Sequence, residues 1–437
     1  MLDILFENRV SLKLKKIFSK ADRFFCKLAR YRHYKYLFRN KFIIDTPSEK
    51  FLSLVLELQD IEQQLIDESE KEKLRYSVFR RDFSSVLWAW ACEQKIRSAH
   101  NQFYDTMIIF IEGYECYCDT GVTTSEAYYS SRQLYWITNG SFNEFWASFY
   151  GLFFPKYLLP NQVENLELIK LKDLQNVVGE IKKNGYHIFD TKLNSEISDR
   201  LVSFAEVSLC KLSPYYPELS TKEYLIYDRH NPKSVTYRID EQELAKNLDI
   251  QNLIADFSVI SMVQEYFGCR AVLRNISMWW STDLLKGASD SSSAQLYHWD
   301  GDAIKFINIF VYLTEVTTHN GPHCFVRNSH RSKPPSLLRD GRFSDQEIED
   351  FYGKNNIDEI VGKKGTIIAA DTRAFHKGKA LEDGERLILM LTFSTDLFGA
   401  PYSSIQLSDQ LTDSLSISMR YSPYTYARLT LTSKAVE

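Results

Sequence analysis

The sequence lacks any long uninterrupted run of apolar residues. No stretch reaches the roughly 18 consecutive apolar residues that a membrane-spanning helix needs, so we expect no transmembrane segment. The first residues, Met-Leu-Asp-Ile-Leu-Phe-Glu, carry acids where a secretory signal would have its apolar core. We therefore expect no secretory signal and predict a cytoplasmic location.

Cysteine is sparse and irregularly spaced. The chain of 437 residues has seven cysteines, at positions 26, 92, 116, 118, 210, 269 and 324. An odd number without paired zinc spacing predicts neither a disulfide framework nor a structural zinc site, and Cys116 and Cys118 are too close for a zinc knuckle. We interpret the cysteines as reduced thiols, which is typical of a cytosolic protein.

A strong net charge and an internal repeat are also absent. The net charge of −4 argues against nucleic-acid binding by the whole chain. Hydrophobic residues make up 44% and aromatic residues 14% of the sequence, which is enough for a sizeable core. The length predicts two domains.

Residues 1–165 are predicted to form a mainly helical N-terminal domain of unknown role, because apolar residues recur at helical spacing. Pro155 and Pro160 mark its end. The basic side chains within residues 9–41 fit three roles: a helix packed on the acidic remainder, which we favour, peripheral contact with an anionic surface such as lipid, or binding of an anionic carrier such as coenzyme A or phosphopantetheine. An organelle transit peptide fits less well, since the segment has many tyrosines.

Residues 166–437 are predicted to form an α+β domain with a sandwich or barrel of short strands. Helices are expected at Leu171–Lys183, which ends at Asn184-Gly185, and at Ser195–Leu209. Strands are expected at Tyr186–Phe189, Ala271–Trp280, Gln295–Trp299, Lys305–Leu313, Gly365–Ala370 and Arg386–Ser394.

The segment Tyr297-His298-Trp299-Asp300 carries the candidate chemistry. On a strand, residues two apart point to the same face, so His298 and Asp300 can offer one nitrogen and one oxygen to a single metal ion. His376 follows an apolar strand and can supply a third ligand. Two histidines and one carboxylate leave the opposite face of the metal open, which suits Fe(II) that binds a cosubstrate and oxygen.

Arg386 lies ten residues beyond His376 and opens an apolar strand. Strand alternation places one set of side chains on one face, namely Arg386, Ile388, Met390, Thr392 and Ser394. A buried guanidinium requires an anion, and its fork matches a carboxylate in two hydrogen bonds. The distal carboxylate of 2-oxoglutarate would be that anion.

These segments together resemble the phytanoyl-CoA dioxygenase family of Fe(II)/2-oxoglutarate-dependent oxygenases. The resemblance covers about residues 171 to 399, and its matching stretches are 297–300, 305–316, 320–323, 328–330, 365–371, 376–378 and Arg386. It implies a double-stranded β-helix, or jelly-roll, core with flanking helices. It also implies Fe(II), 2-oxoglutarate and O2 as cofactors, with His298, Asp300 and His376 as catalytic iron ligands and Arg386 as the cosubstrate clamp.

The resemblance further places His330 near the cosubstrate, although Asn328 stands where relatives often have glycine. Gly378 has no hydroxyl at the position two after the distal histidine. The second contact to 2-oxoglutarate is therefore assigned to Thr392 or Ser394.

Other residues admit both a structural and a functional interpretation. Histidines such as His323 are commonly solvated in loops, and Lys305 is either a strand residue or a pocket cation. Asp371 either hydrogen-bonds a ligand histidine or caps a turn. The tryptophans either fill the core or shape an apolar substrate pocket; they are Trp279, Trp280 and Trp299.

The predicted function is a 2-oxoglutarate-dependent hydroxylase acting on an unidentified small-molecule, lipid-linked or carrier-linked substrate, with succinate and CO2 as products. A halogenase on the same fold would need a small residue at Asp300 to admit chloride. A different class of protein is a non-catalytic metal-binding jelly-roll module used for sensing or scaffolding. Arg386 argues against that class.

Overall fold

The computed structural model describes residues 47–94, 100–160, 166–214, 220, 222–284, 296–407 and 410–431. The basic segment 9–41 lies outside these described residues. The chain divides by its internal contacts into two compact units, Met1–Ile111 and Glu112–Glu437. The predicted domain boundary between residues 165 and 166 stays a prediction.

The first unit is helical where it is described. Its elements are α2 (Pro47–Gln64), α3 (Glu68–Glu93) and the start of α4 (His100–Thr120). The Asp67 side chain begins α3 by accepting a hydrogen bond of 2.9 Å from the Glu70 amide. The aromatic-rich stretch from Val86 to Ala91 is buried within α3. Among the described residues, no helix is both long and apolar enough to cross a bilayer.

Helices of the second unit surround a sheet core. They are α5 (Ser125–Thr138), α6 (Ser141–Phe153), α7 (Leu174–Asn184), α8 (Ser195–Val207), α9 (Glu241–Lys246), α10 (Leu248–Ile254), α11 (Phe257–Phe267), α12 (Asp345–Tyr352) and α13 (Asp413–Tyr421). The predicted helices at residues 171–183 and 195–209 are confirmed as a short 3-10 turn with α7 and as α8. Gly185 ends α7 with φ 92°, a left-handed conformation that favours glycine.

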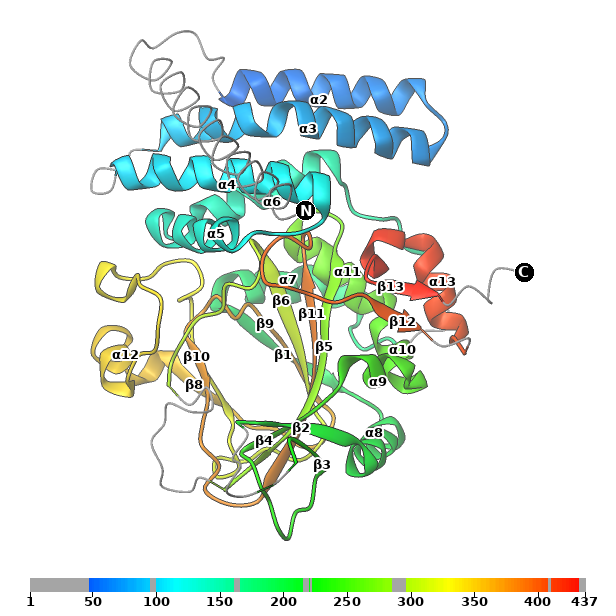
Figure 1. Ribbon diagram of the computed structural model, residues 1–437, viewed down its shortest axis with the longest axis vertical. Helices are drawn as coiled ribbons and strands as arrows, with labels where there is room; N and C mark the ends of the chain where they lie inside the picture. The colour runs from blue at the N-terminus through cyan, green and yellow to red at the C-terminus, as the bar shows by residue number, and fades with distance from the viewer. Residues whose placement is uncertain are drawn as a thin grey trace, which may run out of the picture. The chain divides into compact units, whose positions relative to one another are not determined.

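The strands form a large antiparallel sheet opposed by a small one (Figure 1). The large sheet has the order β1-β9-β6-β11-β5-β4-β2-β3 and the small sheet the order β10-β7-β8. The strands are β1 (Tyr186–Lys192), β2 (Leu209–Ser213), β3 (Tyr224–Ile226), β4 (Thr236–Ile239), β5 (Val272–Thr282), β6 (Phe306–Tyr312), β7 (His323–Val326), β8 (Ile357–Ile360), β9 (Thr366–Ala370), β10 (His376–Gly378) and β11 (Glu385–Ser394), with β12 (Ile405–Leu407) and β13 (Leu429–Leu431) as a separate pair. The predicted jelly-roll core is confirmed.

One predicted strand is not regular. The segment before Asp300 forms only isolated bridges, from Tyr297 to Phe343 and from His298 to His376. Each residue pairs with a different partner segment, so no continuous ladder can form. The His298 bridge joins this segment to the first residue of β10.

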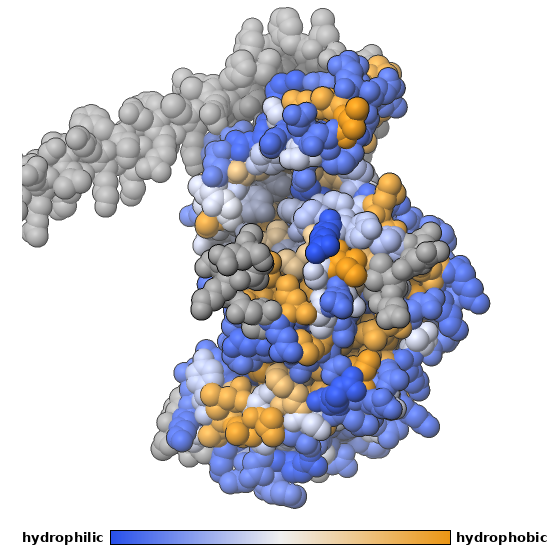
Figure 2. All heavy atoms as spheres, turned by 90° about the vertical axis from the view of Figure 1, so that its right-hand side faces the viewer, coloured by the Kyte–Doolittle hydropathy of each residue, from blue (hydrophilic) through white to orange (hydrophobic). Residues whose placement is uncertain are grey.

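Strand β11 lies near the centre of the large sheet, and the side chains on its face away from the cavity are buried. Leu387, Leu389, Leu391 and Phe393 alternate with the cavity-facing residues and are fully buried. Burial of one such side chain contributes about 1.5–3 kcal/mol. The face of the molecule in Figure 2 is largely hydrophilic, with hydrophobic residues scattered over it. Such a mixture is common for protein surfaces.

Candidate metal centre and its cavity

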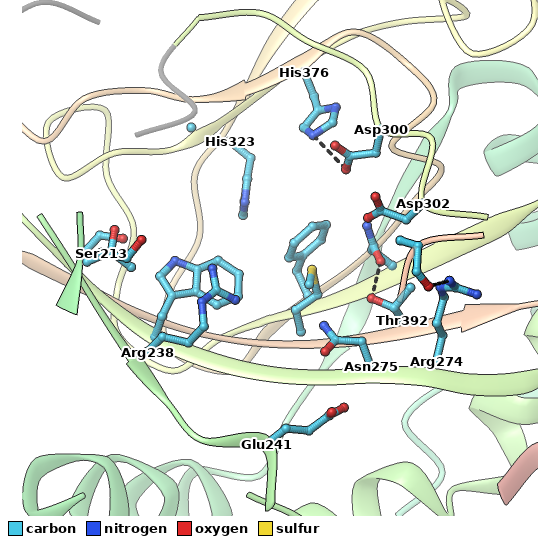
Figure 3. Close-up of a pocket in the computed structure, with 18 of the residues that line it drawn as sticks. Ser213, Arg238, Glu241, Arg274, Asn275, Asp300, Asp302, His323, His376 and Thr392 are labelled. Carbon is cyan, nitrogen blue, oxygen red and sulfur yellow. Dashed lines mark hydrogen bonds and ion pairs between the residues drawn. The ribbon is translucent and has the colours of Figure 1, made fainter. Parts of the chain in front are cut away.

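A cavity of about 740 Å³ lies between the large sheet and the small sheet (Figure 3). Strands β4, β5, β6 and β11 form one wall, and β7 and β10 contribute to the other. Pockets of about 300–1,000 Å³ hold small-molecule ligands in proteins. The cavity is therefore large enough for a cosubstrate together with a second small molecule.

The predicted triad converges at one end of this cavity. One donor atom from each of His298, Asp300 and His376 lies within 4.8 Å of the other two. The His298 Nε2 atom is 3.7 Å from Asp300 Oδ1, and the His376 Nε2 atom is 3.5 Å from Asp300 Oδ2. Three residues from two distant segments thus form one potential metal site.

Hydrogen bonds to backbone carbonyls determine which ring nitrogen of His298 and His376 is available to a metal ion. The His298 Nδ1 atom is 3.0 Å from the Leu296 carbonyl oxygen, and the His376 Nδ1 atom is 2.9 Å from the Ala374 carbonyl oxygen. A carbonyl only accepts, so each Nδ1 carries the proton and each Nε2 keeps a lone pair. Such bonds orient metal-binding histidines.

Electrostatics hold the ligands in metal-binding protonation states. Burial and the neighbouring His376 lower the pKa of His298 to about 3. Burial alone would raise the pKa of Asp300, but His376, His298 and a hydrogen bond from Thr372 hold that pKa well below its usual range. At neutral pH both groups are therefore ready to bind a cation without first losing a proton.

A chain of side-chain hydrogen bonds leads from the sheet to Asp300. The Thr392 hydroxyl donates to Asn308 Oδ1 at 2.7 Å, and Asn308 Nδ2 donates to the Thr372 hydroxyl at 2.9 Å. Thr372 hydrogen-bonds the Asp300 carboxylate, and its carbonyl accepts from the Asp300 amide at 2.8 Å. Thr392 lines the cavity as predicted, but its proton is committed to Asn308.

Arg386 also reaches the cavity and is 5% exposed. Its Nη2 atom lies 3.4 Å from Ser281 Oγ, whereas Nε and Nη1 have no hydrogen-bond partner among the described residues. Burial lowers the pKa of Arg386. A buried guanidinium with unused donors is a site for an anion.

His330 does not line the cavity. It follows a turn at Asn328, whose φ is 62°, and its Nε2 atom is 3.2 Å from the Lys182 carbonyl oxygen at the end of α7. Its Nδ1 atom packs where a side chain at Gly185 would collide with it. The structure therefore places His330 at the end of α7, outside the cavity that the triad lines.

His323, which sequence reasoning left open, is buried on β7 and lines the cavity. Burial, then the charges of Arg386 and His376, lower the pKa of His323 well below its usual range. The Tyr312 hydroxyl donates to the Ile360 carbonyl at 3.0 Å, so it accepts from His323 Nδ1 at 3.0 Å. His323 is therefore neutral, with Nε2 as an acceptor.

Of the residues for which the sequence left both a structural and a functional interpretation open, the others have structural contacts, and one tryptophan lines the cavity. Lys305 pairs with Glu144 at 2.5 Å, and Asp371 pairs with Arg373 and caps its turn, since it accepts the Arg373 amide at 3.0 Å. Trp280 and Trp299 are buried in the core. Trp279 lines the cavity.

The donor set fits a non-haem iron centre, since two histidines and one carboxylate leave coordination positions open. The phytanoyl-CoA dioxygenase (PhyH) family model matches residues 250–385, a range that contains all three donors and ends one residue before Arg386. Over this range the chain is similar to the phytanoyl-CoA dioxygenase family. The match and the donor set together indicate an Fe(II)/2-oxoglutarate-dependent oxygenase.

Comparison with solved structures gives distant likenesses. SnoN, the α-ketoglutarate-dependent epimerase from nogalamycin biosynthesis, is 15% identical over 51% of this chain and 81% of its own, with a TM-score of 0.37. EctD from S. alaskensis is 15% identical over 55% and 80%, with a TM-score of 0.36. HygX from Streptomyces hygroscopicus, with nickel and 2-oxoglutarate bound, is 13% identical over 56% and 94%, with a TM-score of 0.36. No curated protein matches the chain significantly.

Proposed function

We propose that this chain hydroxylates a small molecule, either free or linked to a lipid or carrier, and releases succinate and CO2 from 2-oxoglutarate. One observation carries the proposal. The triad and Arg386, a buried cation whose Nε and Nη1 lack partners among the described residues, line a single cavity. A metal site alone would not require a second, anion-binding residue in the same space.

His298, Asp300 and His376 would hold Fe(II), with the lone pairs of both Nε2 atoms and one carboxylate oxygen as ligands. When bound, the iron supplies the activation of O2 that no side chain can provide. Asp300 keeps its charge because its surroundings, which include a hydrogen bond from Thr372, hold the pKa of the carboxyl well below its usual range. The backbone bridge between His298 and His376 fixes the two rings.

Arg386 would bind the distal carboxylate of 2-oxoglutarate and so orient its keto-acid end toward the triad. Its fork matches a carboxylate, and the low-polarity surroundings strengthen the pair. Thr392 can add only an acceptor, since its hydroxyl donates to Asn308. His323 lies on the opposite wall, on β7, and adds a second acceptor, suited to a hydroxyl or amide of the substrate.

A cytoplasmic location is part of the proposal. The cysteines whose side chains the structure describes are free thiols, namely Cys116, Cys118, Cys210, Cys269 and Cys324. Reduced thiols and an Fe(II) centre both suit a reducing compartment.

The direct test is formation of succinate. Protein loaded with Fe(II) should convert 2-oxoglutarate to succinate in the presence of O2, and a metabolite screen should find compounds that stimulate this turnover. Asp300→Ala is the matched control, since it removes one ligand and leaves Arg386 intact. Iron-loaded protein that neither binds 2-oxoglutarate nor forms succinate would support the alternative of a sensing or scaffolding module.

A further inference from the structure

The cavity wall carries an arginine that the proposed chemistry does not use and that has few protein partners. Arg238 lies on β4 beside Trp279 of β5, and both line the cavity. In Figure 3 Arg238 lies across the cavity from His376 and Asp300. Its guanidinium carbon is 5.4 Å from the centre of the Trp279 ring, so the indole supports one side of the guanidinium.

Besides Arg238 and Arg386, two further arginines line the cavity, and both have several protein partners. Arg428 binds both oxygens of Glu241, at 3.0 and 2.7 Å. Arg274 donates to the carbonyls of Asp396 at 3.4 Å and Phe398 at 3.3 Å, and to that of Ala400. These two arginines hold the wall together and have little capacity left for a ligand.

Arg238 is different. Within the described parts of the chain it makes one side-chain hydrogen bond, from Nη1 to Ser277 Oγ at 3.2 Å, and no ion pair. Three acids line the cavity, and none forms an ion pair with Arg238 among the described residues: Glu241 pairs with Arg428, Asp300 belongs to the triad, and the charge of Asp302 interacts with Arg274 and Arg132. The guanidinium is exposed to the cavity, with the remaining donors of its fork available.

Arg238 is also separate from the cosubstrate clamp. Arg386 on β11 pairs with Ser281 of β5, whereas Arg238 on β4 pairs with Trp279 of β5. The two arginines therefore lie on opposite sides of β5, two residues apart along it. One small dicarboxylate bound at Arg386 and the triad would leave Arg238 unoccupied. The volume of the cavity admits a second molecule beside it.

We infer that Arg238, supported by Trp279, binds an anionic group of the substrate, a carboxylate or a phosphate, and so anchors the substrate end remote from the iron. The inference rests on the proposed function and adds the substrate class. A guanidinium can bind an oxyanion through two hydrogen bonds. An anionic substrate group would therefore be the ion-pair partner that Arg238 lacks among the described residues. The substrate is then an acid or a phosphomonoester.

The test uses the full chain with Fe(II) and saturating 2-oxoglutarate under anaerobic conditions, so that Arg386 is occupied. Benzoate, phenyl phosphate and the neutral benzamide are titrated by calorimetry. We expect wild-type protein to bind benzoate or phenyl phosphate at least about tenfold more tightly than benzamide, since hydrogen bonds to a charged group are stronger than those between neutral groups. The better of the two anions identifies carboxylate or phosphate.

Arg238→Gln should reduce the preference for the anion to within about twofold, whereas Lys379→Gln should retain it. Lys379 is the matched control because it lines the same cavity but already pairs with Glu359 at 3.2 Å. Arg238→Lys keeps the charge without the fork, should retain part of the preference, and serves if Arg238→Gln fails to fold.

Three results would overturn the inference: no anion preference in wild-type protein, an unchanged preference in both Arg238 variants, or an equal loss in Lys379→Gln. The affinity for 2-oxoglutarate, measured in the same proteins, separates this inference from the proposed function. If Arg238→Gln loses 2-oxoglutarate binding, Arg238 belongs to the cosubstrate site and the inference fails. If wild-type protein does not bind 2-oxoglutarate, the proposed function fails.

Discussion

His298 and His376 hydrogen-bond each other through their backbones in both directions. The His298 amide donates to the His376 carbonyl at 3.0 Å, and the His376 amide donates to the His298 carbonyl at 2.9 Å. The bridge brings the two ring centres to 4.4 Å, although the residues lie in separate segments of the chain. Main-chain atoms therefore position two of the three proposed ligands before any metal binds.

The first prediction concerns metal affinity. His376→Ala removes a proposed ligand but leaves the backbone bridge in place. We expect Fe(II) binding to weaken by more than about 100-fold, because loss of a mere supporting residue already costs about 10–100-fold. Competition with a chromogenic chelator under anaerobic conditions measures the effect.

The control is His319→Ala, since His319 is exposed and pairs with Glu382 at 2.7 Å outside the cavity. Its affinity should equal that of wild-type protein. An unchanged affinity in His376→Ala would remove this residue from the metal site.

The second prediction is that replacing Arg386 lowers the affinity for 2-oxoglutarate but raises the free energy of unfolding. Arg386→Met should lower the affinity for 2-oxoglutarate by about 100-fold or more, because loss of a buried charged partner costs about 2–5 kcal/mol. The same change should raise the free energy of unfolding without ligand by about 1–3 kcal/mol, since it removes a buried charge with unused donors. Calorimetry and chemical denaturation measure the two effects.

Arg339→Met is the matched control, because Arg339 lies outside the cavity and pairs with Glu347 at 2.9 Å. It should affect neither quantity by more than a small amount. Retained 2-oxoglutarate affinity in Arg386→Met would contradict the clamp, and a large loss of stability would indicate a structural role for Arg386.

The parts of the site that depend on local spacing could be predicted from sequence. His298 and Asp300 are two residues apart, and Arg386, Met390 and Thr392 share a face of one strand, so alternation alone groups each set. The apolar runs of β5, β6, β9 and β11 are continuous enough to identify the central strands.

The remaining residues depend on strand register, which the sequence does not reveal. Asn308 meets Thr392 because β6 and β11 pair there, and Arg238 meets Trp279 through the register of β4 and β5. His330 was expected near the cosubstrate from a family resemblance. The left-handed turn at Asn328 precedes it, and its ring meets the end of α7 instead.

The third prediction concerns the hydrogen-bond chain that ends at Asp300. Thr372→Val removes the hydroxyl that connects Asn308 to the carboxylate while preserving the side-chain shape. Fe(II) affinity should fall by about 10–100-fold, the usual cost of losing a residue that orients a metal ligand. Thr372→Ser should restore it, since serine keeps the hydroxyl.

Thr366→Val is the control for loss of a buried threonine hydroxyl, because Thr366 donates to the Lys363 carbonyl at 2.8 Å at the start of β9. Its metal affinity should match wild-type protein even if its stability falls. Equal metal affinities in the valine and serine variants at position 372 would show that the hydroxyl does not position Asp300.

The last prediction is a pH dependence of stability that arises at His330. Burial lowers the pKa of His330 to about 4. Its Nε2–H donates to the Lys182 carbonyl, and its Nδ1 has no partner among the described residues, so a second proton would be a buried donor without an acceptor. Protonation is therefore much easier in the unfolded chain, where histidine titrates near pH 6.5.

The direction of this pH dependence follows from which state, folded or unfolded, binds the extra proton on His330. Between about pH 6.5 and 4 the unfolded state binds the extra proton and the folded state does not, so stability falls as the pH falls through this window and is unaffected by His330 above it. In His330→Gln the amide can still donate to Lys182 but does not titrate. The difference in unfolding free energy between wild-type and variant should therefore shift toward the variant by on the order of 3 kcal/mol from pH 7 to pH 4. Burial also raises the pKa of Asp396 to about 6, which acts in the opposite direction but equally in both proteins. Denaturation at a series of pH values measures the difference, and a difference that is constant with pH would show that His330 titrates normally in the folded protein.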